Sequence, residues 1–172
     1  MAGKPPGIKV LRGLLDSDDI AKLRGQCHSL PAPTGNPLFR LFGDFGDNKA
    51  TEEVRPWMVE WGQRMYAERR FRELPNQYRV CNWLGEHSAQ FKWHIDSKRH
   101  GEEILVISLT DGRKIGFRPP GRPEHTWVLE LAAGDGYFMR GAARWSWDHC
   151  VLPSGAGRSG GESFILAYRR TQ

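Results

Sequence analysis

The residue types best suited to chemistry lie in two short segments, Trp93-His94-Ile95-Asp96 and Trp145-Ser146-Trp147-Asp148-His149. On a β-strand the side chains at i and i+2 point to the same side, so His94 and Asp96 can bind one ion together. His149, in the second strand-like segment, supplies a third ligand. Two histidines and one carboxylate on one face of an octahedral ion leave three positions open, as in the non-haem Fe(II) oxygenases. We therefore predict that His94, Asp96 and His149 are both the metal ligands and the catalytic centre.

A His-x-Asp pair is a weak signal when it stands alone. It also fits an exposed histidine next to an aspartate that caps a turn, or a core histidine bonded to a backbone carbonyl. The remaining histidines, at positions 28, 87, 100 and 125, lie in helical or loop-like contexts without such a partner. The metal interpretation therefore depends on the elements that surround the pair.

Two helices are predicted in the first half of the chain. Carboxylates at the start of the segment 17–30, followed by apolar residues at helical spacing, predict the first helix. Pro56 suits the first turn of the second, in which Trp57, Trp61 and Met65 share one face. Between them, residues 31–55 are rich in Pro, Gly, Asn and Asp and predict an irregular segment with one short strand.

From residue 77 onward, short β-branched or aromatic segments alternate with turn signals and no helical pattern separates them. This pattern predicts a mainly β fold with flanking helices, a sandwich or jelly roll. We expect one domain over residues 1–172, with a flexible leader at 1–8. The predicted strands are 78–84, 91–96, 104–109, 114–118, 126–131, 136–139, 145–151 and 163–169.

Composition limits the choice of partner and compartment. Lys and Arg (25) outnumber Asp and Glu (20), which gives a net charge of +5 and a pI near 9.3. This favours a polyanionic partner, above all nucleic acid, although a generically basic surface has the same composition. Three cysteines without a CxxC pair indicate neither a disulfide framework nor a zinc ribbon. The sequence has no long apolar run, so we expect no membrane span. We also expect a monomer in the cytoplasm or nucleus.

The order of segments from about residue 8 to residue 170 resembles the AlkB-like Fe(II)/2-oxoglutarate-dependent dioxygenase family. The resemblance is carried by the segment 75–84, by His94-Ile95-Asp96-Ser97, and by Arg144-Trp145-Ser146-Trp147-Asp148-His149. It implies a double-stranded β-helix, Fe(II) and 2-oxoglutarate as cofactors, and hydroxylation or demethylation of a nucleobase in nucleic acid.

The same resemblance implies a set of cosubstrate-binding residues. Asn82, twelve positions before His94, matches the asparagine of the family's Asn-x-Tyr pair, whereas Leu84 stands where the tyrosine is expected. In the final strand Arg169 matches the second arginine of an Arg-x5-Arg motif, and Ser163 replaces the first. Three explanations stay open: Arg169 binds the cosubstrate alone, Arg158 reaches in from the preceding loop, or the cosubstrate is not ordinary 2-oxoglutarate.

The substrate is less closely defined. A base in a duplex must be flipped out, which requires stacking and phosphate contacts, and the candidate residues are Trp93, Lys98, Arg99, Arg113 and Arg118. Residues 31–55 are a short segment for the recognition lid that the family carries, so a protein or small-molecule substrate stays open. So do a cupin-like metal protein and a degenerate, non-catalytic binding module of the same fold.

Overall fold

The computed structural model describes residues 3–33, 38–46, 51–83, 92–153 and 160–170. The strands in these ranges are β1 (Ile8–Leu11), β2 (Phe39–Gly43), β3 (Thr51–Glu52), β4 (Gln77–Trp83), β5 (Glu103–Ser108), β6 (Arg113–Arg118), β7 (Trp127–Leu131), β8 (Gly136–Met139), β9 (Asp148–Leu152) and β10 (Gly161–Tyr168). The helices are α1 (Ser17–His28), α2 (Pro56–Ala67) and α3 (Gly141–Trp145).

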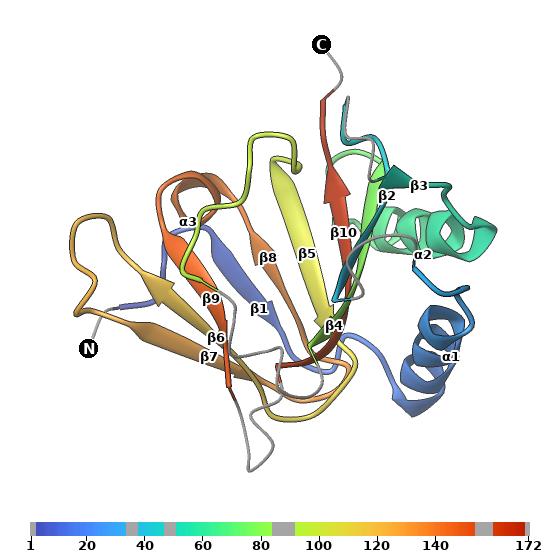
Figure 1. Ribbon diagram of the computed structural model, residues 1–172, viewed down its shortest axis with the longest axis horizontal. Helices are drawn as coiled ribbons and strands as arrows, with labels where there is room; N and C mark the ends of the chain where they lie inside the picture. Colours follow the sequence, from blue (N-terminus) through green and yellow to red (C-terminus); the bar gives the residue numbers. More distant parts are fainter. Residues whose placement is uncertain (1–2, 34–37, 47–50, 84–91, 154–159, 171–172) are drawn as a thin grey trace.

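The strands form two sheets that face each other, and α1 and α2 cover the outer side of the larger one (Figure 1). The larger sheet has seven strands in the order β1-β8-β5-β10-β4-β2-β3, and the smaller has three in the order β7-β6-β9. Paired strands are antiparallel, apart from β2 and β3. The prediction of a mainly β fold with flanking helices is confirmed.

The two predicted helices form where the sequence places their first turns. The carboxylate of Asp16 accepts a hydrogen bond from the Asp19 backbone N–H at 2.9 Å and caps α1. Pro56 occupies the first turn of α2, where its missing N–H costs no hydrogen bond. None of the helices in the described part of the chain is long and apolar enough to cross a membrane.

Burial on both sides of the central strands explains their nearly continuous apolar sequence. In β5, Leu105 and Ile107 pack toward α1 and α2, whereas Ile104 and Val106 point toward the smaller sheet. Because successive side chains alternate across a strand, β5 contributes to two cores at once. The second core, between the sheets, contains the cavity described below.

Several elements differ from the prediction. The predicted strand 145–151 is shorter than expected, because Trp145 ends α3 and β9 begins only at Asp148. In the predicted strand 91–96, the described residues form a single bridge at His94. The strands β1 and β3 were not predicted. From Pro5 onward the expected flexible leader is tied down, since the carbonyls of Pro6 and Gly7 accept hydrogen bonds from the segment 140–143. These elements are short, and the partners of β1 and His94, which are β8 and His149, lie far away in the sequence.

Candidate metal centre

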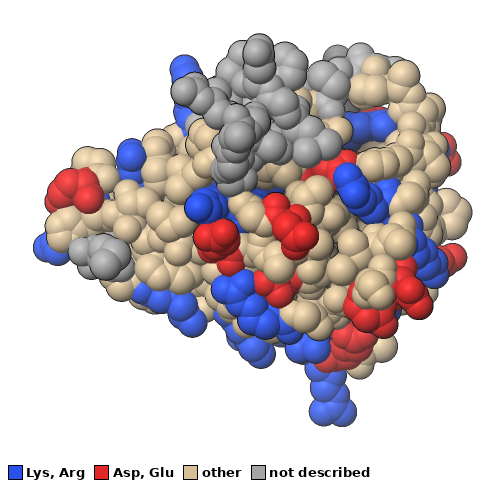
Figure 2. Space-filling model, turned by 90° about the horizontal axis from the view of Figure 1, so that it is seen from below, with Lys and Arg blue, Asp and Glu red and all other residues tan. Residues whose placement is uncertain are grey.

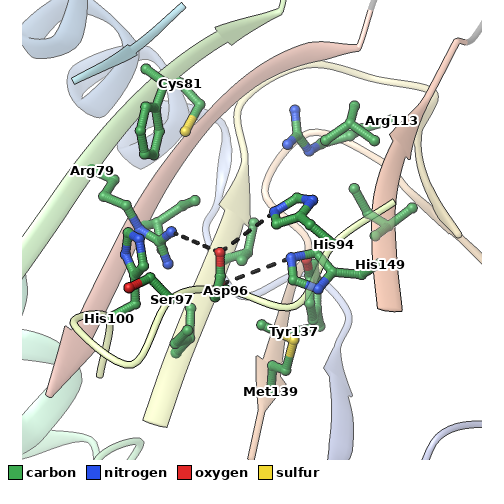
Figure 3. A pocket seen from close by; sticks show the side chains of 16 residues that line it. Arg79, Cys81, His94, Asp96, Ser97, His100, Arg113, Tyr137, Met139 and His149 are labelled. Carbon is green, nitrogen blue, oxygen red and sulfur yellow. Dashed lines mark ion pairs between the residues drawn. The ribbon is translucent and has the colours of Figure 1, made fainter. Parts of the chain in front are cut away.

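The predicted ligand residues His94, Asp96 and His149 come together at the edge of the cavity between the sheets (Figure 3). His94 precedes β5 and exchanges two backbone hydrogen bonds with His149 of β9, at 3.1 and 2.9 Å. Nε2 of His94 lies 3.6 Å from Oδ1 of Asp96, and Nε2 of His149 lies 3.9 Å from Oδ2. One ligand atom from each residue falls within 4.8 Å of the others.

This geometry fits one metal ion. Donors on adjacent corners of an octahedron, with bonds of about 2.1 Å, lie roughly 3 Å apart. The two distances to Asp96 therefore need to shorten by less than about 1 Å, a change within the reach of side-chain rotation. Two imidazoles and one carboxylate are the ligand set of a facial triad with open positions. His94, Asp96 and His149 are the residues that would hold such an ion.

Neighbouring groups fix the orientation of the ligands. Nδ1 of His94 bonds the Lys92 carbonyl at 2.8 Å, which leaves Nε2 to face the site. Arg144 is fully buried, and its guanidinium donates to four backbone carbonyls of the segment that carries Asp96. These carbonyls belong to Asp96, Ser97, His100 and Gly101, at 2.8 to 3.0 Å. Arg144, which belongs to the motif that resembles the family, thus holds in place the loop that follows the His-x-Asp pair.

The electrostatic environment acts differently on the three groups: burial lowers the pKa of His94, but hydrogen bonds to Asp96 and to the Lys92 carbonyl outweigh it and raise that pKa. Burial by itself would raise the pKa of Asp96, but Arg79, at 3.6 Å, and the two histidines hold it well below the usual value. Burial lowers the pKa of His149 to about 4, against the attraction of Asp96. At neutral pH the site therefore presents a carboxylate and a neutral imidazole, the forms that bind metal.

The cavity beside the triad is small, partly open to solvent, and lined by both apolar and polar side chains. Its volume is about 190 Å³, below the range typical of drug-sized ligands. Ile104, Val106 and Ile165 form apolar walls, and Arg79 and Arg113 are the two arginines that line it. It therefore suits a short, acidic molecule.

The structure separates the predicted cosubstrate residues. Asn82 is exposed and lines a different cavity, because strand alternation turns it away from Arg79 and Cys81. Arg169 lies outside the cavity lining, and its Nη1 contacts Asp44 at 3.3 Å. Ser163 is fully buried on the face of β10 that looks between the sheets. Arg158 and Leu84 lie outside the described residues.

Two basic residues of the cavity were not assigned to the cosubstrate by the sequence. Arg79 interrupts the apolar strand β4 at an inward position, a signal that was available but ambiguous. Arg113 had been considered only for substrate contacts. Arg113 lies at the same spacing as Ile115 and Phe117 along β6, so the sequence places its side chain on their inward face. Only the folded structure shows that Arg113 reaches the metal cavity.

The chain is similar in fold to several solved structures. The chain matches a structure named OsALKBH1 with a TM-score of 0.64 at 13% identity, covering 98% of this chain and 100% of that one. A 2OG-Fe(II) oxygenase family oxidoreductase from Burkholderia pseudomallei gives 0.63 at 16% identity over 96% and 89% of the two chains. A Pseudomonas putida prolyl-4-hydroxylase gives 0.57 at 17% identity over 96% and 87%. No family model matches the sequence, and no curated protein matches it significantly. The fold is the jelly roll of the 2-oxoglutarate and Fe(II) oxygenases.

Proposed function

We propose that this protein is an Fe(II)- and 2-oxoglutarate-dependent dioxygenase that hydroxylates or demethylates a nucleobase in nucleic acid. The observation that carries the proposal is the convergence of His94, Asp96 and His149 at a small cavity lined by two arginines. A degenerate binding module of the same fold has no need for an intact set of three metal ligands. A cupin-like site usually adds further histidine ligands, and the ligand group in the described residues has only these two.

Bound Fe(II) with 2-oxoglutarate and O₂ supplies the oxidising power for C–H hydroxylation. One oxygen atom enters succinate, formed with loss of CO₂, and the other enters the substrate, where a hydroxylated N-methyl group leaves as formaldehyde. The protein holds the reacting groups in position and determines the environment around them. Arg144 holds the loop of Asp96, and apolar side chains form part of the wall around the reacting groups.

Basic residues beside the triad support a nucleic-acid substrate. Lys92, Lys98 and Arg99 are exposed on the segment that also carries His94 and Asp96. Their charges suit phosphate contacts near a base that has been turned toward the metal. The net charge of +5 acts in the same direction over long range.

The rest of the surface gives less support. Figure 2 shows Lys and Arg interspersed with Asp and Glu on one face of the molecule, so positive charge is not concentrated there. The nucleic-acid part of the proposal therefore depends on the residues next to the triad. A protein or small-molecule substrate is the alternative, since one similar structure is a prolyl-4-hydroxylase.

Succinate release tests the enzymatic part. With Fe(II), 2-oxoglutarate and O₂, we expect slow turnover by the wild type without substrate, and none by His94→Ala or Asp96→Ala. His125→Ala, which removes an exposed histidine in a loop, is the matched control and should behave like the wild type. No turnover and no Mn(II) binding by the wild type would refute the oxygenase proposal.

The substrate class requires a separate experiment. Methylated single- and double-stranded oligonucleotides are incubated with the enzyme, and their masses are measured by mass spectrometry. A loss of 14 mass units per methyl group, about the mass of one CH₂, is expected, together with faster succinate release. Turnover that no oligonucleotide accelerates, but a proline-containing peptide does, would overturn the nucleic-acid part and leave the oxygenase part intact.

A further inference from the structure

A buried guanidinium without an acidic partner lies in the metal cavity. Arg113, the first residue of β6, is 2% exposed, and burial lowers its pKa. Its Nη1 donates to the carbonyls of Gly160 and Gly161 at 2.6 and 3.3 Å, and its Nε is buried without a hydrogen-bond partner. No carboxylate among the described residues forms an ion pair with it. A buried charge in this state is costly unless an anion binds there.

A second polar side chain lies on β10 of the facing sheet. Ser163 is fully buried, and its hydroxyl is hydrogen-bonded to the thiol of Cys81. It stands two positions after Gly161 on β10, so both residues present the same face of the strand. Cys81, its register partner on β4, interacts electrostatically with Arg113. Ser163 lines the adjacent cavity and not the metal cavity, so Arg113 is the donor at this end to which a carboxylate in the metal cavity can bind.

The other end of the same cavity is the metal triad. Figure 3 shows Arg113 beyond His94, on the side away from Arg79 and Ser97. Arg79 already faces a carboxylate, that of Asp96, at 3.6 Å, whereas Arg113 faces none in the described residues. A short molecule with an acid group at each end can thus span the cavity from the triad to Arg113.

We propose that Arg113 binds the far carboxylate of the 2-oxo acid cosubstrate and selects a dicarboxylate over a monocarboxylate. The proposal rests on the proposed oxygenase function for the identity of the ligand. It assigns to β6 the role that the resemblance gave to the arginine of the last strand. Arg169 is directed to Asp44 and lies outside the cavity lining.

Equilibrium binding without turnover tests this assignment. The protein is loaded with Mn(II) under argon and titrated with 2-oxoglutarate or 2-oxopentanoate, which has the same five-carbon chain and a methyl group in place of the far carboxylate. The wild type should prefer 2-oxoglutarate. Arg113→Met should lose about 10- to 100-fold of the 2-oxoglutarate affinity, the range of a charge-assisted hydrogen bond. Its affinity for 2-oxopentanoate should change by less than about threefold, because this acid has no far carboxylate to contact Arg113.

Further variants keep the test decisive. Ser163→Ala, which changes the adjacent cavity, should leave the affinity for both acids within about threefold of the wild type. Arg113→Lys should retain part of the preference, because the charge stays and the planar fork is lost. If Arg113→Met fails to fold, Arg113→Lys carries the comparison. Arg122→Met, in an exposed loop, is the matched control for loss of an arginine.

Each remaining outcome has one meaning. If Arg113→Met retains the 2-oxoglutarate preference, or if Arg169→Met loses it instead, the assignment to Arg113 is overturned while the oxygenase function stands. Equal weakening of both acids by Arg113→Met also overturns it, since a structural defect is not selective. A wild type that binds Mn(II) but neither acid refutes the proposed cosubstrate, and the assignment with it.

Discussion

The guanidinium of Arg144 donates to four backbone carbonyls of the loop that carries Asp96. Arg144→Met keeps most of the side-chain volume and removes all four hydrogen bonds. We expect a loss of roughly 2–4 kcal/mol in the free energy of unfolding, because buried carbonyls lose charged donors. The Mn(II) affinity should fall by at least about tenfold, as for other residues that orient metal ligands. Urea denaturation and Mn(II) titration measure the two effects, and an unchanged Mn(II) affinity would exclude an orienting role.

Gly116 makes room for the residue next to the first ligand. A Cβ at this position would lie 2.5 Å from Cη2 of Trp93, whose ring is also covered by the Arg118 guanidinium, 3.6 Å from its centroid. Gly116→Val should displace Trp93 from β6 and disturb His94. We expect the free energy of unfolding to fall by about 1–3 kcal/mol, as is typical of overpacking, and Mn(II) binding to weaken. Gly25→Ala is the matched control, since nothing lies within 4 Å of that position in α1. It should stabilise the protein by about 0.5–1 kcal/mol. Equal Mn(II) affinity in Gly116→Val and the wild type would contradict this account.

The candidate metal ligands were within reach of the sequence, and the arginines that line the cavity were not. His94 and Asp96 follow from a local rule, the i and i+2 spacing, and the distal histidine from its motif. Asn82 was carried over by position in a motif, but the register of β4 turns it away from the cavity. The burial of Arg113 without a carboxylate depends on contacts between β6 and β10, which no local pattern encodes.

Among the elements, the turn between β7 and β8 connects the two sheets to the N-terminal strand. Asp135, 6% exposed, accepts hydrogen bonds from the backbone N–H groups of Gly13 and Ala132, at 2.9 and 3.1 Å, and pairs with Arg12 at 2.5 Å. Burial opposes its charge, but these donors prevail and lower the pKa of Asp135. The charged carboxylate therefore stabilises the folded state.

A pH series tests the contribution of Asp135. Because its folded-state pKa is lowered, the stabilisation is present above the unfolded pKa, near 3.9, and is lost as pH falls through the folded pKa. Asp135→Asn should be less stable than the wild type by about 1–3 kcal/mol at pH 7, the worth of charged hydrogen bonds. The difference should shrink below pH 4, as followed by urea denaturation. A difference that stays constant from pH 7 to pH 2.5 would show that charge plays no part.

Elements with strong local signals were predictable. The first helix had its acidic start, the second had Pro56, and β5 had an unbroken apolar run bounded by turns. The weaker elements carry little local signal: the four-residue β1 depends on the distant strand β8, and β3 consists of only two residues beside β2. In 145–151 the aromatic content favoured a strand, but the backbone of 142–146 closes a helical turn beneath the N-terminal segment.

At the scale of the whole molecule, the three candidate ligands come from both sheets. His149 belongs to β9 of the smaller sheet, whereas the segment of His94 and Asp96 leads into β5 of the larger one (Figure 1). An ion bound by all three would therefore link the layers on one side of the cavity. The unfolded chain does not hold the three groups together, so binding to the folded state adds directly to its stability.

This linkage predicts a concentration-dependent rise in the melting temperature. At 100 times the dissociation constant, a ligand specific for the folded state adds about 2.7 kcal/mol, or roughly 5–11 °C for a protein of this size. Mn(II) should produce this rise in the wild type, 2-oxoglutarate should add to it only when Mn(II) is present, and EDTA should reverse both. Asp96→Ala should show neither rise, while His125→Ala should match the wild type in differential scanning fluorimetry. If Mn(II) stabilises Asp96→Ala as much as the wild type, the ion binds elsewhere and His94, Asp96 and His149 do not form the metal centre.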